Sequence, residues 1–174
     1  MTGSTASTIY FSSVPDTPIG EIWIARSERG LVAIEWDSKR SELLDYLTRR
    51  LKFSVEENPH HLADIASQLR EYLAGKRSRF EISIDWSQMR PFQREALLAT
   101  FAIPYGQTST YGELATQIGH PRAARAVGRA EATNPMPLVI PCHRVLGADG
   151  KLRGYGGGLK IKKWLLQMEG AVLA

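Results

Sequence analysis

Three short runs near the N-terminus constrain the fold of this chain more than any other feature of its sequence. Residues 8–14, 19–26 and 30–36 are rich in Ile, Val, Tyr, Phe and Trp, and the turn-forming stretches 17–20 and 27–30 separate them. Residues of these types favour strands, and connections this short join neighbouring antiparallel strands. The sequence therefore predicts a three-stranded antiparallel meander at the start of the chain.

Two amphipathic helices are predicted after the meander. Leucines at helical spacing predict one helix over residues 38–51, and a second apolar face predicts another over residues 61–73, ended by Gly75. Residues 80–84 then alternate in polarity like one more strand.

A domain boundary is expected in the middle of the chain. The stretch 85–90 is polar and precedes Pro91, a pattern typical of a linker. We therefore expect a disordered tail over residues 1–7, an N-terminal domain over 8–88 and a C-terminal domain over 89–174.

The two predicted domains differ in charge. Residues 1–88 hold 11 basic and 13 acidic side chains, whereas residues 89–174 hold 11 basic and 5 acidic ones. A basic domain suggests a polyanionic partner, although a solvated basic surface gives the same count. One cysteine cannot form an internal disulfide, and no apolar run approaches the length of a membrane span. We therefore expect a soluble, cytoplasmic protein.

The second domain contains a helix-turn-helix pattern. A helix is expected over residues 92–101, after Pro91, and Thr110-Tyr111-Gly112-Glu113 then fits a capping box. Tyr111 should thus lie in the first turn of a helix that runs to about Ile118. A tight Gly-containing turn separates it from a further helix over residues 122–130, as in a helix-turn-helix.

This second helix combines a basic stripe with small residues. Its arginines fall at i, i+3 and i+7, so they share one face, and the small residues between them give a thin profile that suits a DNA groove. A helix packed through its alanines, with arginines in solvent, fits equally well. The arginines are Arg122, Arg125 and Arg129, and the small residues include Ala124, Ala126 and Gly128.

The only cysteine lies in the motif Pro141-Cys142-His143-Arg144-Val145. Residues 137–140 are interpreted as a short buried strand stopped by Pro141, so the thiol is expected where a strand leaves the core. His143 and Arg144 are potential cations, and such neighbours lower a thiol pKa. Asn134 adds turn-forming chemistry upstream. A buried structural cysteine is the alternative.

The C-terminal segment adds a glycine-rich loop and a misplaced acid. Residues 154–158 hold four glycines around Tyr155 and form either a ligand-binding or a flexible loop. A last helix is expected over residues 159–168. Glu169 follows in its last turn, where the helix dipole disfavours a carboxylate by up to about 1 kcal/mol. A cation should accompany Glu169, and His143 is a candidate; solvent exposure is the alternative.

Together these motifs resemble the O6-alkylguanine-DNA alkyltransferases, also called methylated-DNA–protein-cysteine methyltransferases. The Pro-Cys-His-Arg motif in its Asn-Pro context is the most specific part. The resemblance implies an α/β (α+β) protein with a ribonuclease-H-like N-terminal lobe and a mostly helical, winged-helix-like C-terminal lobe. It rests on residues 123–128, 134–135, 141–145, 155–158 and 164–170.

The resemblance also implies a function. Members transfer the alkyl group of O6-methylguanine, and of O4-methylthymine, irreversibly from double-stranded DNA to a cysteine, after flipping the base out of the duplex. Each chain would then react once, because a thioether is not hydrolysed by the site. We expect a monomer, with cooperative assembly on DNA left open, and no membrane, cofactor or metal.

Carried over by position, the resemblance assigns the reaction to five residues. Cys142 would accept the alkyl group, His143 would take its proton through a water molecule, and Glu169 would orient His143. Asn134 would hold the turn of the active site. Tyr111 would assist flipping and hydrogen-bond guanine N3.

Further residues would bind the base and the DNA. The carbonyl groups of Cys142 and Val145 would accept from the exocyclic amine of guanine, the Gly156 amide would point at O6, and Tyr155 would wall the pocket. Arg125 would fill the gap left in the base stack. The rest of the DNA-binding helix would be represented by Arg122, Ala124, Ala126, Gly128 and Arg129.

Two positions depart from the family pattern. Gly156 stands where some members have serine, which leaves the preference for bulky adducts open. Glu131 puts an acid near the groove-facing helix. His60 and His61 lack a third ligand at recognisable spacing, so a surface loop is preferred to a metal site there.

Two other functions are weighed against repair. A sensor that flips alkylated guanine without repairing it is disfavoured by the presence of Cys142. A cysteine hydrolase is disfavoured because adjacent side chains on an extended strand, such as Cys142 and His143, point to opposite faces.

Overall fold

The computed structural model describes residues 7–36 and 39–173. Residues 1–6 of the predicted tail and Ser38 of the first predicted helix lie outside the described residues. The chain divides into two compact units, Met1–Gln88 and Met89–Ala174. Of the helices in the described ranges, none combines the length and the apolar character needed to cross a membrane.

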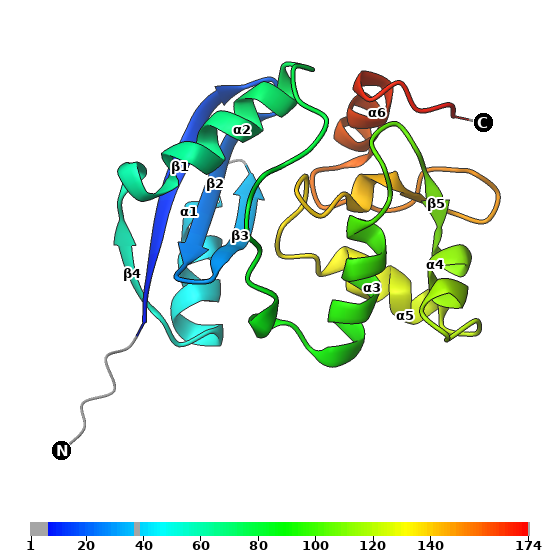
Figure 1. The fold of residues 1–174 in the computed structure, drawn as a ribbon, viewed down its shortest axis with the longest axis horizontal. Coiled ribbons are helices and arrows are strands. Elements are labelled where there is room, and N and C mark those ends of the chain that lie inside the picture. The colour runs from blue at the N-terminus through cyan, green and yellow to red at the C-terminus, as the bar shows by residue number, and fades with distance from the viewer. Residues whose placement is uncertain (1–6, 37–38, 174) are drawn as a thin grey trace. The chain divides into compact units, whose positions relative to one another are not determined.

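The first unit is built on a mixed four-stranded sheet with the order β3-β2-β1-β4 (Figure 1). The predicted meander is confirmed as β1 (Thr8–Thr17), β2 (Gly20–Ser27) and β3 (Gly30–Trp36). A fourth strand, β4 (Ser54–Glu57), pairs in parallel with β1 and was not predicted. Its sequence has a single apolar residue, as suits a short strand at the edge of a sheet.

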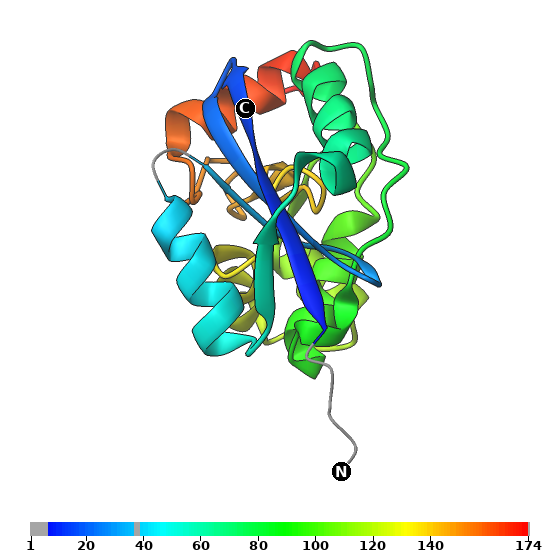
Figure 2. The same ribbon diagram turned by 90° about the vertical axis from the view of Figure 1, so that its left-hand side faces the viewer.

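The predicted helices of this unit are present, each with an irregular turn at one end. α1 (Arg40–Asp45) continues as a π-helical turn (Tyr46–Arg50), and a 3-10 turn (Pro59–Leu62) leads into α2 (Ala63–Leu73). Figure 2 shows α1 and α2 running alongside the sheet. Leucines of the first helix lie in one core with apolar residues of the strands, among them Ile9, Phe11 and Trp23.

The prediction of a strand over residues 80–84 is wrong. This segment forms a single parallel bridge, between Leu31 and Ile84. A Cβ at Gly30 would lie 2.3 Å from the Ser83 carbonyl oxygen, so only a glycine permits this approach. The segment thus meets the sheet at one point and does not extend the ladder.

The second unit is mostly helical, as predicted. Its helices are α3 (Pro91–Phe101), α4 (Tyr111–Gln117), α5 (Ala124–Ala132) and α6 (Leu159–Met168). α3, α4 and α5 contribute Ala96, Leu114 and Val127 to one apolar core.

Two very short strands tie the start of α4 to the segment after Cys142. β5 (Ser109–Thr110) and β6 (Val145–Leu146) pair in parallel, with Ser109 opposite Val145. This pairing brings the helix-turn-helix and the cysteine motif into one structure, although about 35 residues separate them along the chain.

Residues 137–140 do not form the predicted strand. They are turns in which the Ile140 N–H donates to the Met136 carbonyl and Leu138 has a φ of 73°. The three prolines in and around this segment lack the N–H group that a strand ladder needs.

The second helix of the helix-turn-helix begins two residues later than predicted. Its first residue is Ala124, because the Ala123 N–H donates to the His120 carbonyl and closes a turn before the helix. Arg122 therefore lies in that turn.

Candidate active site

Cys142 begins a 3-10 turn (Cys142–Arg144) and is 8% exposed. Burial raises the pKa of its thiol to about 12, the negative charge of Glu131 adds to the rise, and a hydrogen bond with Asn134 opposes it. The predicted low thiol pKa is therefore wrong. At neutral pH the sulfur carries its proton, so attack on an alkyl group requires a base.

His143 and Glu169 form a fully buried pair. His143 Nε2 lies 2.8 Å from Glu169 Oε1, so the contact that the helix-dipole argument suggested is confirmed. What the two residues do in the reaction stays a prediction. An ionised carboxylate only accepts hydrogen bonds, so Nε2 carries a proton and Nδ1 is the nitrogen that can take another.

Arg144 is the second partner of Glu169, which the sequence analysis missed. Its Nε donates to Glu169 Oε2 and its Nη2 to Oε1, each at 2.9 Å, while Nη1 donates to the Ile103 carbonyl at 2.6 Å. Such a two-pronged contact is the strongest form of arginine–carboxylate pairing. Because the guanidinium charge is directed at Glu169, it does not lower the pKa of the neighbouring thiol.

These contacts set the ionisation of the pair. Burial raises the pKa of Glu169, but the hydrogen bonds from His143 and Arg144 outweigh burial and hold the pKa at about 2. Burial lowers the pKa of His143, although Glu169 opposes the change. At neutral pH the site therefore holds an ionised carboxylate and a neutral imidazole, the form that can act as a general base.

Asn134 fixes the turn that leads to Cys142. Its Nδ2 donates to the Ile140 carbonyl at 2.9 Å, and its Oδ1 accepts from the Met136 N–H at 3.0 Å. Inside this turn the buried Leu138 adopts a left-handed backbone that costs a non-glycine residue about 1 kcal/mol. The turn is therefore held by its hydrogen bonds and packing, and the sulfur is held with it.

The expected pocket residues surround the same cysteine motif. The Tyr155 ring meets the His143 ring edge-on, with centroids 6.4 Å apart. Burial, followed by the charges of Glu131 and Cys142, raises the pKa of Tyr111, which begins α4. Val145 is buried in β6, directly after the 3-10 turn.

Gly156 is exposed, and a Cβ built on it meets no atom within 4 Å. Its backbone also lies outside the left-handed region. The chain therefore has room for the serine that some family members carry at this position, without strain.

The helix-turn-helix has the predicted capping box. The Glu113 N–H donates to Thr110 Oγ1 at 3.2 Å, and the Thr110 N–H donates to Glu113 Oε2 at 2.7 Å. Arg125 and Arg129 are both exposed on α5, one helical turn apart, whereas Arg122 is exposed in the preceding turn. The basic stripe on the helix itself is thus made by two arginines.

The small residues of α5 allow close packing on its inner side. A Cβ at Gly128 would lie 3.9 Å from the Tyr111 ring, so the two helices meet there. Ala124 and Ala126 are half-buried. Both explanations of the small residues, a thin helix and helix packing, are therefore compatible with the fold.

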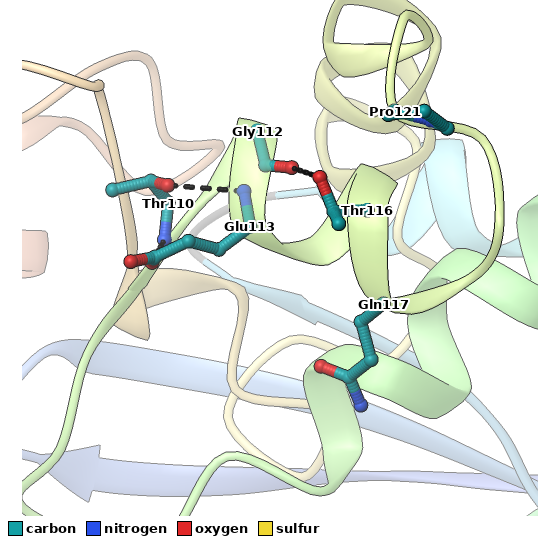
Figure 3. A pocket seen from close by; sticks show the side chains of 6 residues that line it. All are labelled: Thr110, Gly112, Glu113, Thr116, Gln117 and Pro121. Carbon is teal, nitrogen blue, oxygen red and sulfur yellow. Dashed lines mark hydrogen bonds between the residues drawn. The ribbon is translucent and has the colours of Figure 1, made fainter.

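A hollow on α4 lies apart from this chemistry. Figure 3 shows that its lining includes the capping-box pair and the bond from Thr116 Oγ1 to the Gly112 carbonyl. Gln117 and Pro121 complete it, and none of the predicted catalytic residues takes part. Within this hollow, the bonds between Thr110 and Glu113 cap the start of α4.

The histidines of the first unit, His60 and His61, lie at the surface, as predicted. The His61 ring stacks on Tyr10 with centroids 3.9 Å apart, and His60 is exposed. Across residues 7–36 and 39–173, no three His, Cys, Asp or Glu side chains gather in a group that could hold a metal ion.

Two buried charged residues near the site were not anticipated. Glu131 lies on α5, the predicted groove-facing helix, but its side chain is 7% exposed and points inward. Lys162 of α6 is fully buried, and its Nζ donates to the Val145 carbonyl at 2.7 Å and to the Arg153 carbonyl at 3.2 Å. A lysine three residues after an apolar helix start is an ordinary surface pattern, so the sequence carried no signal for its burial.

Comparisons with known proteins agree over both units. Two protein-family models match the chain. The family described as 6-O-methylguanine DNA methyltransferase, ribonuclease-like domain, matches residues 9–86, and the family described as 6-O-methylguanine DNA methyltransferase, DNA binding domain, matches residues 91–171. A methylated-DNA–protein-cysteine methyltransferase of Mycobacterium bovis is 46% identical over 161 residues, covering 92% of each chain. The Salmonella typhimurium protein of the same name is 42% identical over 90% of this chain and 94% of its own.

Solved structures agree as well. The crystal structure of the Mycobacterium tuberculosis O6-methylguanine methyltransferase superposes with a TM-score of 0.77 at 36% identity, covering 93% of both chains. The structure of Mycobacterium tuberculosis OGT in complex with DNA gives a TM-score of 0.76 at 36% identity, covering 92% of both chains.

Proposed function

The chain belongs to the 6-O-methylguanine DNA methyltransferase family, and from that premise we propose that Cys142 accepts the methyl group and His143, oriented by Glu169, removes its proton. The chain binds DNA and repairs O6-methylguanine directly, by methyl transfer to a cysteine. Cys142 is the only cysteine available for this transfer.

The observation that carries the proposal is the buried His143–Glu169–Arg144 network directly after the buried thiol of Cys142. The thiol proton passes to His143 through a bridging water, and the resulting imidazolium is stabilised by Glu169. The sulfur then attacks the methyl carbon: the S–C bond forms while the bond from that carbon to O6 breaks. The electron pair leaves with guanine, which takes up one proton, equal in number to the one that His143 removed from the thiol, so the net step needs no other reactant.

Donors around the base support the departing guanine. As its negative charge develops, the hydroxyl of Tyr111 and the amide of Gly156 stabilise it, which is the general role of preorganised donors in such reactions. The raised pKa of Tyr111 keeps its hydroxyl protonated and able to donate.

A methylated base within a duplex is out of reach of a buried sulfur, so the base must be flipped out, at a cost of a few kcal/mol. We assign this task to α5, with Arg125 filling the gap in the stack. The exposure of Arg125 and Arg129 on one side of that helix supports contact with double-stranded DNA. O4-methylthymine, which has a similar methyl–oxygen bond, is a second substrate on the same chemistry.

The thioether product is not cleaved by the His143–Glu169 pair, so each chain acts once. The protein should work as a monomer, and the need for a reduced thiol favours the cytoplasm.

Mass spectrometry of the chain after mixing with an O6-methylguanine duplex tests the proposal. One methyl group on the Cys142 peptide, in a one-to-one ratio with protein, is expected. Turnover beyond that ratio would contradict single use and favour a hydrolase-like site.

Variants separate transfer from binding. Cys142→Ser should keep DNA affinity and lose transfer, whereas a sensor would be indifferent to that change. Arg125→Ala should slow repair of duplex far more than reaction with the free base, with Arg94→Ala, which removes an exposed arginine of α3, as the matched control. Equal losses on both substrates would exclude a flipping role for Arg125.

A further inference from the structure

Glu131 is a buried acid that the reaction as described does not use. It lies in the last turn of α5 and is 7% exposed. Its Oε1 is in hydrogen-bond contact with Thr100 Oγ1, at 2.5 Å, and its Oε2 is buried with no hydrogen-bond partner among the residues that the structure describes. A carboxylate in such a place is either charged at high cost or protonated.

The contact with Thr100 is compatible with both forms. The Thr100 hydroxyl also lies 3.0 Å from the Ala96 carbonyl, but it has a single hydrogen. If Glu131 is neutral, its own hydroxyl can donate to Thr100 while Thr100 donates to Ala96. If Glu131 is ionised, Thr100 must turn its hydrogen toward Glu131. The site can thus hold or release a proton without rearranging the backbone.

Glu131 adjoins the reactive site, because its neighbour Ala130 packs in one apolar core with Val145 and the Tyr111 ring faces Gly128 of α5. The groups whose ionisation the charge of Glu131 affects lie in that site. They are Cys142 in the 3-10 turn, Tyr111 of α4 and Lys162 of α6; from α3 the facing group is the uncharged Thr100. Lys162 forms no ion pair within the described ranges, and its contacts are the two carbonyls of Val145 and Arg153. Its charge favours the thiolate of Cys142, and the charge of Glu131 disfavours it.

We propose that Glu131 is a positioning residue for alkyl transfer: its carboxylate counters Lys162 and holds Cys142 in the thiol form until His143 takes the proton. The inference rests on the proposed role of Cys142 as acceptor. It adds that the reactivity of the Cys142 sulfur depends on Glu131 as well as on Glu169.

The pH dependence follows from the sign of the interaction. Burial raises the pKa of Glu131 to about 7, with Thr100 and Lys162 opposing the rise. Below that pH Glu131 is neutral, so the positive charge of Lys162 is not countered by Glu131 and the thiol pKa of Cys142 is lower. Above it Glu131 is charged and the thiol pKa is higher. The thiolate fraction therefore grows less than tenfold per pH unit where Glu131 ionises.

The test measures the reaction of the full chain with iodoacetamide, which reports the thiolate at the single cysteine. In the wild type, the logarithm of the rate should bend between about pH 6 and about pH 8. In Glu131→Gln the line should be straight and the rate above neutral pH roughly three to ten times higher. Glu131→Asp should restore the bend, and Glu95→Gln, which removes an exposed carboxylate of α3, should leave the wild-type profile unchanged.

A straight wild-type profile would overturn the inference without any variant. The inference can therefore be tested even if Glu131→Gln folds poorly. An unchanged rate in a folded Glu131→Gln overturns it as well. Methyl transfer from an O6-methylguanine duplex is measured on the same wild-type sample. Absence of transfer contradicts the proposed function, whereas transfer with unaltered iodoacetamide profiles contradicts only the role of Glu131.

Discussion

The surroundings of Glu131 and Glu169 show how one residue type reaches very different pKa values within one small domain. Both lie at the C-terminal end of a helix, and both are less than a tenth exposed. Glu169 accepts hydrogen bonds from an imidazole and a guanidinium and has a pKa of about 2; Glu131 has one hydroxyl partner and a pKa of about 7. The exposed surface of the two residues is nearly equal. The donors around each carboxylate therefore account for much of the difference between their pKa values.

The largest effect is expected from removing the charge of Glu169. In Glu169→Gln, His143 loses the group that stabilises its protonated form, so methyl transfer should fall about a hundredfold or more. Arg144 would be left as an unpaired buried charge, which should lower the free energy of unfolding by about 3 kcal/mol. Single-turnover transfer and chemical denaturation measure the two quantities. A transfer rate close to that of the wild type would show that Glu169 is structural only.

The free energy of unfolding should fall as the pH rises through the pKa of Glu131. A carboxyl with a raised pKa contributes stability below its unfolded pKa, and this contribution is lost as the pH rises through the folded value of about 7. The free energy of unfolding of the wild type should therefore fall, relative to Glu131→Gln, by about 3 kcal/mol between acidic and mildly alkaline pH. Denaturation of both proteins across that range checks this. A constant difference would mean that Glu131 keeps one protonation state.

A smaller effect is expected from weakening one donor of Glu169. Arg144→Lys keeps the positive charge but cannot make the two-pronged contact, so the free energy of unfolding should fall by about 2 kcal/mol. Methyl transfer should fall less than in Glu169→Gln, because the bond between His143 and Glu169 remains. If Arg144→Lys were as slow as Glu169→Gln, the guanidinium would have a direct part in the reaction.

The smallest effect should come from the single partner of Glu131. Thr100→Val removes the hydroxyl with little change in shape, at a cost of about 1 kcal/mol at mildly alkaline pH. Because this hydrogen bond lowers the pKa of Glu131, its loss should move the bend in the iodoacetamide profile to higher pH. A bend that stays in place would indicate that Thr100 does not stabilise the charged form.

Local patterns predicted most of the fold. The strand runs, the helical periodicities and the capping box each depend on neighbours within a few residues, and each is present. β4 was missed because an edge strand needs little apolar content, and residues 137–140 were misassigned because their apolar composition was weighted above their prolines.

The site was predictable only in part. Motif and spacing pointed to Cys142, His143 and Glu169 together. The partner of Arg144 lies 25 residues away, and the inward direction of Glu131 depends on packing against α3, so no local pattern reports either. For the same reason the thiol pKa was wrongly predicted: adjacency in sequence placed Arg144 beside the sulfur, and the fold turned it away.

The burial of Cys142 also has a consequence for how long a chain stays usable. A protein that reacts once is a stored reagent, and its useful life is the time before its sulfur is oxidised or capped by a stray electrophile. Those side reactions proceed through the thiolate. A pKa raised from 9.0 to about 12 leaves about a thousandfold less thiolate at neutral pH than an ordinary cysteine would have. The burial that makes the sulfur dependent on a base thus also slows oxidation and unwanted alkylation of the unused protein.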